Sequence, residues 1–156
     1  MSAIEAKLAN LGVTLPETGA APKAAGNYVP HVISGKMVYV SGQISQDENG
    51  PIRGKLGDDY TLEQGAAAAR TCAIALLTQL KLACGGDLDR LVRVVKLTGF
   101  VNSTADFTDQ PKVINGCSDF LVEALGDKGA HARSAVSAAS LPLGVAVEIE
   151  GIFEIA

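Results

Sequence analysis

The stretch VAVEIEGIFEI, residues 145–155, is the most regular part of this 156-residue chain and decides its fold class. Its odd-numbered positions hold aliphatic residues, Phe or Gly, whereas its even-numbered positions include Glu148, Glu150 and Glu154. An alternation with a period of two predicts a β-strand that buries one face. Residues 133–139 precede it across the turn-forming sequence SLPLG, so the C-terminal segment is predicted to be a β-hairpin.

Two helices are predicted upstream of this hairpin. The first begins at a capping box, in which the side chains of Thr61 and Gln64 bond free backbone N–H groups, and ends at the glycines 85–86. The second runs from a cap at position 106 or 108 to Gly126 and carries a proline in its first turn. Both carry apolar side chains on one side, as a helix that covers a sheet must.

A β-rich run at 91–102 separates the helices, and another hairpin is predicted at 31–40, where Ser34-Gly35-Lys36 divides two apolar runs. The order is therefore hairpin, helix, strand, helix, hairpin, which predicts an α+β two-layer sandwich. Residues 1–25 are predicted to form an N-terminal helix and a covering arm, and residues 26–156 the main domain. A polar loop is expected at 46–60.

Composition excludes several function classes. The net charge is −4, the pI is about 5.1 and there is no Trp, so neither a phosphate-binding stripe nor a stacking platform for nucleic acid is expected. No apolar run approaches the roughly 20 residues that span a bilayer, and we expect no membrane partner and no signal peptide. Three widely spaced cysteines form neither a disulfide framework nor a metal knuckle, which favours a reduced, cytoplasmic protein with buried thiols.

The predicted C-terminal hairpin brings candidate functional residues together. With its turn at residues 141–142, Ala135 lies opposite Glu148 and Arg133 opposite Glu150, and all four share one face. An arginine fork beside two carboxylates, with a small residue between them, is a plausible carboxylate-binding pocket. The alternative is an ordinary cross-strand ion pair on a solvated sheet face.

Other polar residues allow two interpretations each. Ser41 and Gly42 could let a ligand approach the backbone closely, or could simply form a turn. Tyr28 could orient a ligand or pin the arm, and Asn115 could enter a site or lie on the polar side of its helix. The two histidines fit neither a catalytic triad nor a zinc site, so no metal is expected.

The segment RSAVSAASLPLGVAVEIE, residues 133–150, resembles the C-terminal signature of the Rid family, also called YjgF/YER057c/UK114 and labelled endoribonuclease L-PSP. Tyr28-Val29 and residues 40–44 resemble two further motifs of that family. The strand at 94–101 and the pair Asn115 and Phe120 are also similar. The resemblance extends from about residue 25 to the end of the chain.

This resemblance implies a chorismate mutase-like fold, a homotrimer whose sheets form a central barrel, and ligand clefts at the three subunit interfaces. Family members of the deaminase type hydrolyse reactive 2-imino acids, or their enamine tautomers, to 2-keto acids and ammonia in metabolite damage control. They use no cofactor or metal. The resemblance implies that Arg133 holds the substrate carboxylate and that Glu148 positions or deprotonates the attacking water. The other implied cleft positions are Tyr28, Ser41, Gly42, Asn115 and Ala135.

Two departures from the family pattern bear on this hypothesis. Many family deaminases have Cys where this chain has Ala135, so a thiol role is lost while backbone contacts would survive. The N-terminal arm and the 46–60 loop are longer than in the smallest members. Because Arg133 serves any carboxylate, the alternative function is a non-catalytic trimeric sensor or binder of small carboxylates such as keto acids. A ribonuclease, which the family label suggests, is disfavoured by the acidic pI.

Overall fold

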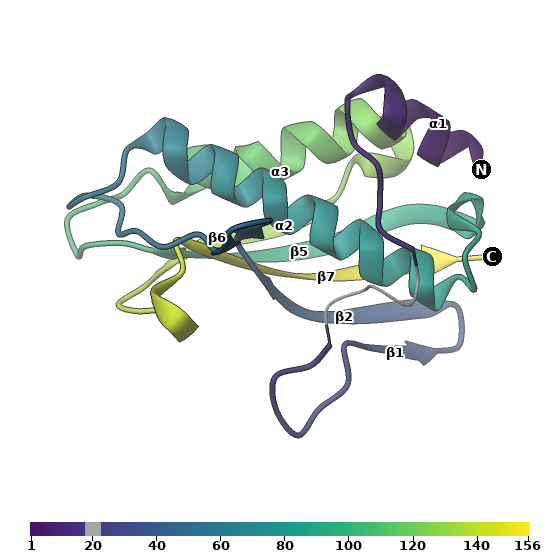
Figure 1. The fold of residues 1–156 in the computed structure, drawn as a ribbon, viewed down its shortest axis with the longest axis horizontal. Helices are drawn as coiled ribbons and strands as arrows, with labels where there is room; N and C mark the ends of the chain where they lie inside the picture. Colours follow the sequence, from purple (N-terminus) through teal and green to yellow (C-terminus); the bar gives the residue numbers. More distant parts are fainter. Residues whose placement is uncertain (18–22) are drawn as a thin grey trace.

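The computed structural model describes residues 1–17 and 23–156 and has two layers, a sheet and the helices that cover one face of it (Figure 1). The sheet has five strands in the order β1-β2-β7-β5-β6. Their bounds are β1 His31–Ser34, β2 Met37–Ile44, β5 Leu91–Asn102, β6 Ala132–Ala138 and β7 Val147–Ile155. The helices α2 and α3 cover one face, which confirms the predicted α+β class.

The helices begin and end close to their predicted boundaries. Helix α2, Leu62–Ala83, starts at the capping box of Thr61 and Gln64, and helix α3, Gln110–Leu125, ends at Gly126. The cap of α3 is Asp109, which makes no side-chain capping hydrogen bond, in place of residue 106 or 108. The Asp106 carboxylate is occupied elsewhere, because it accepts a hydrogen bond of 2.6 Å from Thr104 Oγ1.

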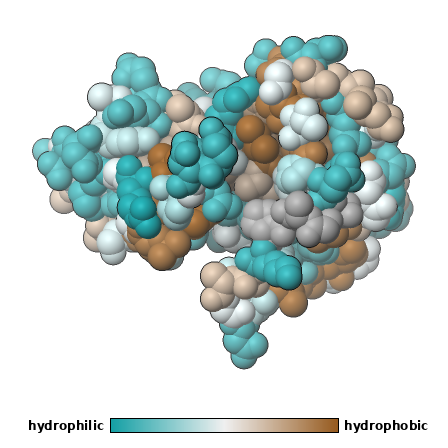
Figure 2. Space-filling model, viewed as in Figure 1, coloured by the Kyte–Doolittle hydropathy of each residue, from teal (hydrophilic) through white to brown (hydrophobic). Residues whose placement is uncertain are grey.

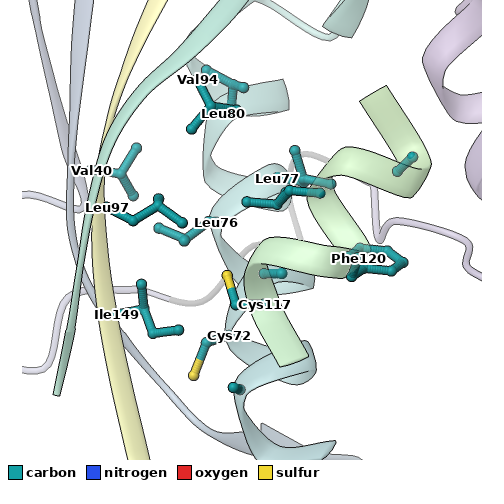
Figure 3. Close-up of a cluster of buried hydrophobic side chains, with 14 of the residues drawn as sticks. Val40, Cys72, Leu76, Leu77, Leu80, Val94, Leu97, Cys117, Phe120 and Ile149 are labelled. Atoms are coloured by element: carbon teal, nitrogen blue, oxygen red, sulfur yellow. The ribbon is translucent and has the colours of Figure 1, made fainter. Parts of the chain in front are cut away.

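The hydrophobic core lies between the sheet and these two helices. Figure 3 shows Leu97 of β5 and Ile149 of β7 pointing towards Leu76 of α2, with Cys72 and Cys117 beside them. All three cysteines are buried and free, as expected of small core thiols. Alternate residues of β7, from Val147 to Ile155, are buried in this core, which confirms the period of two.

The predicted C-terminal hairpin is wrong. Within the described residues, strand β6 pairs only with β5, and the two strands are parallel. Strand β7 lies on the other side of β5 and pairs antiparallel with both β5 and β2. Helix α3 supplies the long crossover that a parallel pair of strands requires. The link from β6 to β7 includes the short 3-10 helix η4, Pro142–Gly144, and carries the chain across the end of β5.

The remaining segments are small. Helix α1, Ala3–Asn10, precedes the covering arm, and of the residues predicted for that arm 18–22 lie outside the described residues. The 46–60 loop contains the ribbon β3, Gln46–Asp47, and β4, Gly50–Pro51. Two further 3-10 helices precede β5 and β6, namely η2 Leu88–Arg90 and η3 Gly126–Gly129.

Candidate functional site

A pocket of about 400 Å³ opens on the face of the sheet that the helices leave uncovered. Its walls come from residues 23–30, from β2, from the start of β7 and from η4. Figure 2 shows the molecule hollowed between the segment 23–30 and η4, on the lower side of the view. Of the residues predicted for the site, Tyr28, Gly42 and Glu148 line this pocket.

Glu148 supplies the carboxylate of the pocket. Its neighbours Val147 and Ile149 point into the core, so the alternation of β7 turns Glu148 to the opposite face. Burial raises the pKa of the Glu148 carboxyl above its usual range, and the nearby charge of Glu150 raises it further. A carboxylate with a raised pKa is a suitable general base close to neutral pH.

Gly42 brings the backbone of β2 against this carboxylate. Ser41 and Gly42 form a β-bulge, because the register with β7 shifts between Val40 and Gln43. A Cβ atom at Gly42 would lie 3.0 Å from Cδ of Glu148, so only glycine leaves the carboxylate undisturbed. Ser41-Gly42 is therefore a bulge within a strand, where the sequence allowed a turn.

Ser41 holds the segment that carries Tyr28. Its Oγ donates a hydrogen bond of 2.8 Å to the carbonyl oxygen of Val29, and its backbone N–H donates one of 2.9 Å to that of Pro30. These bonds fasten the chain beside β2 and leave the Tyr28 side chain 53% exposed at the pocket. Ser41 therefore acts on the pocket wall through the backbone.

Arg133 faces the other side of the sheet. It pairs with Leu97 of β5, a core residue, and its side chain reaches α3. Its Nη1 donates hydrogen bonds of 2.8 Å to Oδ1 of Asn115 and 3.0 Å to Oγ of Ser118. Its Nη2 donates one of 3.1 Å to the carbonyl oxygen of Pro111. The predicted face shared by Arg133, Ala135, Glu148 and Glu150 is thus wrong. Through β5, Glu148 is in register with Val136 and Glu150 with Ser134, so the two glutamates share a face with the even-numbered residues of β6.

The guanidinium of Arg133 is held entirely by neutral acceptors. No carboxylate among residues 1–17 and 23–156 forms an ion pair with it. Three of its five N–H groups are used, which leaves the Nε–H and one Nη2–H without a described partner. Two N–H groups on adjacent nitrogens match the two oxygens of a carboxylate, so the charge and the geometry both favour an anion.

The predicted site residues fall into two groups on opposite faces of the sheet. Tyr28, Ser41, Gly42 and Glu148 lie around the pocket, whereas Asn115 and Ala135 lie with Arg133 on the helix side. The sequence interpretation missed Ser118, which stands three positions after Asn115 and therefore on the same side of α3. That spacing was the available signal.

The described residues show neither a metal site nor a membrane-spanning helix. Within the described part of the chain, no three His, Cys, Asp or Glu side chains are grouped so that they could hold a metal ion. None of the described helices has the length and apolar character required to cross a membrane.

Known proteins similar to this chain carry different descriptions. "Protein TCP17" of Trypanosoma cruzi is 46% identical over 97% of this chain and 94% of its own length. A 2-iminobutanoate/2-iminopropanoate deaminase of Salmonella typhimurium is 35% identical over 85% and 90%. The "Putative regulator AldR" of Lactococcus lactis is 33% identical over 86% and 92%.

Two solved structures share nearly the whole architecture. A protein of unknown function from Agrobacterium tumefaciens is 44% identical, with a TM-score of 0.88 over 98% of this chain and 94% of that one. A "putative endoribonuclease" from Shewanella oneidensis is 34% identical, with a TM-score of 0.90 over 97% and 99%. The family described as "YjgF/chorismate_mutase-like, putative endoribonuclease" matches residues 5–153. The chain belongs to this YjgF/chorismate mutase-like family, which includes the RidA proteins.

Proposed function

We propose that this protein hydrolyses reactive 2-imino acids, or their enamine tautomers, to 2-keto acids and ammonia. The observation that carries the proposal is the guanidinium of Arg133, held by neutral acceptors with an unused pair of N–H groups. A 2-imino acid offers a carboxylate for that pair. The raised pKa of Glu148 supports its role as the base, and the deaminase relatives carry out the same reaction by their printed names.

The proposed reaction requires only a few groups of the protein. Arg133 binds the substrate carboxylate through two parallel N–H groups, and Glu148 takes a proton from a water as its oxygen attacks the imine carbon. Glu148 returns this proton to the nitrogen, which gives an amino alcohol. Glu148 then moves the hydroxyl proton to the nitrogen as well, so that the carbon–nitrogen bond breaks, ammonia leaves and the hydroxyl becomes the keto group. Backbone groups at Gly42 and Ala135 contact the imine or the water, and no cofactor or metal is required.

A complete site needs two copies of the chain. Arg133 and Glu148 lie on opposite faces of one sheet, so a substrate cannot touch both within a single subunit. We propose a homotrimer with a central barrel of sheets, in which the Arg133 group of one subunit meets the Glu148 group of its neighbour. Each of the three interfaces then contains one cleft with Tyr28, Ser41 and Asn115 in its wall.

We further propose that the chain divides at residue 25. Helix α1 and the residues that follow it as far as 17 cover the core, and residues 26–156 form the catalytic domain. The protein works in the cytoplasm in metabolite damage control, on small substrates and without nucleic acid. The net charge of −4 supports the last point, since nucleic acid binding depends on basic residues.

A second candidate function is a sensor of small carboxylates. The relative from Lactococcus lactis that is named as a regulator is 33% identical. Arg133, whose described hydrogen-bond acceptors are all neutral, would bind the carboxylate of a keto acid as well as that of an imino acid. Such a protein would bind keto acid through Arg133 without accelerating hydrolysis. Glu148 distinguishes the two functions, because only hydrolysis needs a base.

The decisive experiment follows keto acid release from 2-iminobutanoate made in situ by a threonine dehydratase, with semicarbazide present to trap the free imine. The wild type is expected to accelerate release, whereas Arg133→Ala and Glu148→Gln lose the acceleration. Arg70→Ala is the matched control, because it removes the same charge from a side chain that lies over the Phe120 ring, 4.7 Å from its centroid. Arg133→Ala should also weaken keto acid binding by about 1.5–3 kcal/mol, the value of a hydrogen bond to a charged group.

The outcomes separate the candidates. Acceleration by the wild type and Arg70→Ala alone supports the deaminase. Keto acid binding that depends on Arg133 without any acceleration supports the sensor. Full activity of Arg133→Ala would contradict both.

A further inference from the structure

The hydrogen-bond network of Arg133 continues from Ser118 to His131. Oγ of Ser118 accepts a hydrogen bond of 3.0 Å from Nη1 of Arg133 and lies 2.9 Å from Nε2 of His131. Nδ1 of His131 lies 2.6 Å from the carbonyl oxygen of Gly129. Ser118 belongs to α3, Gly129 to η3 and Arg133 to β6, so the network joins three elements, and His131 lies directly before β6.

The chemistry of each group gives the network a direction. A carbonyl oxygen carries no proton, so the bond to Gly129 places the ring proton of His131 on Nδ1. In the neutral ring Nε2 is then an acceptor, and the Ser118 hydroxyl donates to it. The lone pairs of Ser118 are thereby turned towards Arg133, and each bond strengthens the next by polarisation.

The far end of the network cannot move easily. A Cβ atom at Gly129 would lie 2.4 Å from the carbonyl oxygen of Leu121, so only glycine allows this close packing of η3 against α3. Gly129 is also buried. The carbonyl that orients His131 is therefore held against the same helix that carries Asn115 and Ser118.

We propose that Ser118 and His131 are positioning residues for Arg133. By holding Nη1, they leave the Nε–H and the second Nη2–H directed at the substrate carboxylate. A free arginine side chain loses much rotamer freedom when it binds, and a side chain already held in place avoids that loss. This inference rests on the proposed function, because it assigns Arg133 to a carboxylate ligand.

The opposing interpretation is that His131 and Ser118 only tie β6 to α3. In that case their replacement would lower stability without a specific effect on ligand binding. Ligand affinity, measured beside thermal unfolding, separates the two interpretations. Conservative replacements sharpen the test, because Ser118→Thr keeps the hydroxyl and His131→Gln keeps an acceptor close to the position of Nε2, whereas Ser118→Ala and His131→Asn do not.

The experiment is calorimetric titration of the full-length protein with 2-ketobutanoate. Ser118→Ala and His131→Asn are expected to bind about tenfold more weakly, the change that corresponds to about 1.4 kcal/mol. Ser118→Thr and His131→Gln should recover most of the affinity. In the deaminase assay the loss should fall on KM, with kcat nearly unchanged, since these residues act through ground-state binding by Arg133.

A double variant makes the test independent of folding effects. Ser118→Ala added to Arg133→Ala should weaken binding no further, because Ser118 acts through Arg133. Unchanged affinity in Ser118→Ala, or an equal additional loss in the Arg133→Ala background, would overturn the inference. If Arg133→Ala itself binds 2-ketobutanoate as the wild type does, the proposed function fails first, and the two failures are thus distinguishable.

Discussion

Gly42 controls the position of the Glu148 carboxylate. In Gly42→Ala the new Cβ would lie 3.0 Å from Cδ and 3.1 Å from Oε2 of Glu148. The side chain can yield by a few tenths of an ångström, so stability should hardly change while the carboxylate is displaced. We expect kcat to fall by about tenfold or more, because small misplacements of reacting groups are costly.

Steady-state kinetics and thermal unfolding of the same preparation check this prediction. Arg70→Ala is again the control, since the described contact of Arg70 is with the ring of Phe120 and not with Glu148. In a Glu148→Gln background, Gly42→Ala should have no further effect on turnover. Wild-type turnover in Gly42→Ala would mean that Glu148 does not act on the water.

The sequence indicated which residue types belong to the candidate site, but it did not indicate which of these residues lie next to one another. Arg133 and Glu148 were selected as candidate site residues and placed on one face, whereas the structure places them on opposite faces of the sheet. Side chains alternate between the two faces along a strand. This alternation tells whether residues of two different strands share a face only when the pairing of those strands is known. Ser118 was missed because a serine within a helix is usually no more than a part of the polar side of that helix.

An ion pair between Glu5 and Lys81 connects helix α1 to helix α2. Oε1 of Glu5 lies 2.7 Å from Nζ of Lys81 on α2, and the two side chains are 17% and 11% exposed. The hydrogen bond with Lys81 lowers the pKa of the Glu5 carboxyl below its usual range. A lowered pKa means that this pair stabilises the fold above pH 4.5 and that the contribution is lost as the pH falls through the lowered value.

Glu5→Gln keeps an acceptor for the capping box of α1 and removes the charge. We expect it to cost about 0.5–1 kcal/mol near pH 7 and less at a pH well below 4.5, where the carboxyl becomes protonated. Urea unfolding at the two pH values measures the difference. Lys112→Gln is the control, because its ion pair with Asp109 is more than half exposed and should contribute little at either pH. An equal loss from Glu5→Gln at both pH values would contradict the assignment.

Elements were predicted well where the signal was local. The capping box at Thr61, the glycine at position 126 and the first hairpin were all recognised from neighbouring residues, and the structure confirms them. The partner of β6 was predicted wrongly because pairing between distant strands leaves no local trace. A link of eight residues, 139–146, allows either a hairpin or a passage across one intervening strand.

At the scale of the whole molecule, the separation of Arg133 and Glu148 predicts subunit complementation. Arg133→Ala and Glu148→Gln chains should each be inactive alone. When they are unfolded together in equal amounts and refolded, about one quarter of the interfaces should combine an intact Arg133 with an intact Glu148 from the neighbouring chain. The mixture should therefore recover about a quarter of the wild-type deaminase activity.

Light scattering on the same samples provides the control. Each should have three times the chain mass of 16.0 kDa, so that a failure to assemble is not mistaken for a failure to complement. No recovered activity in a correctly assembled mixture would show that both residues of a site come from one chain. A mass equal to one chain for the wild type would contradict the trimer.

The place of β7 also bears on how the protein is made in the cell. In chain order β7 follows every other element, yet it lies in the middle of the sheet between β2 and β5. Until β7 leaves the ribosome, the strands β1 and β2 have no backbone contact with β5 and β6. The five-stranded sheet can therefore be completed only after β7 has been synthesised.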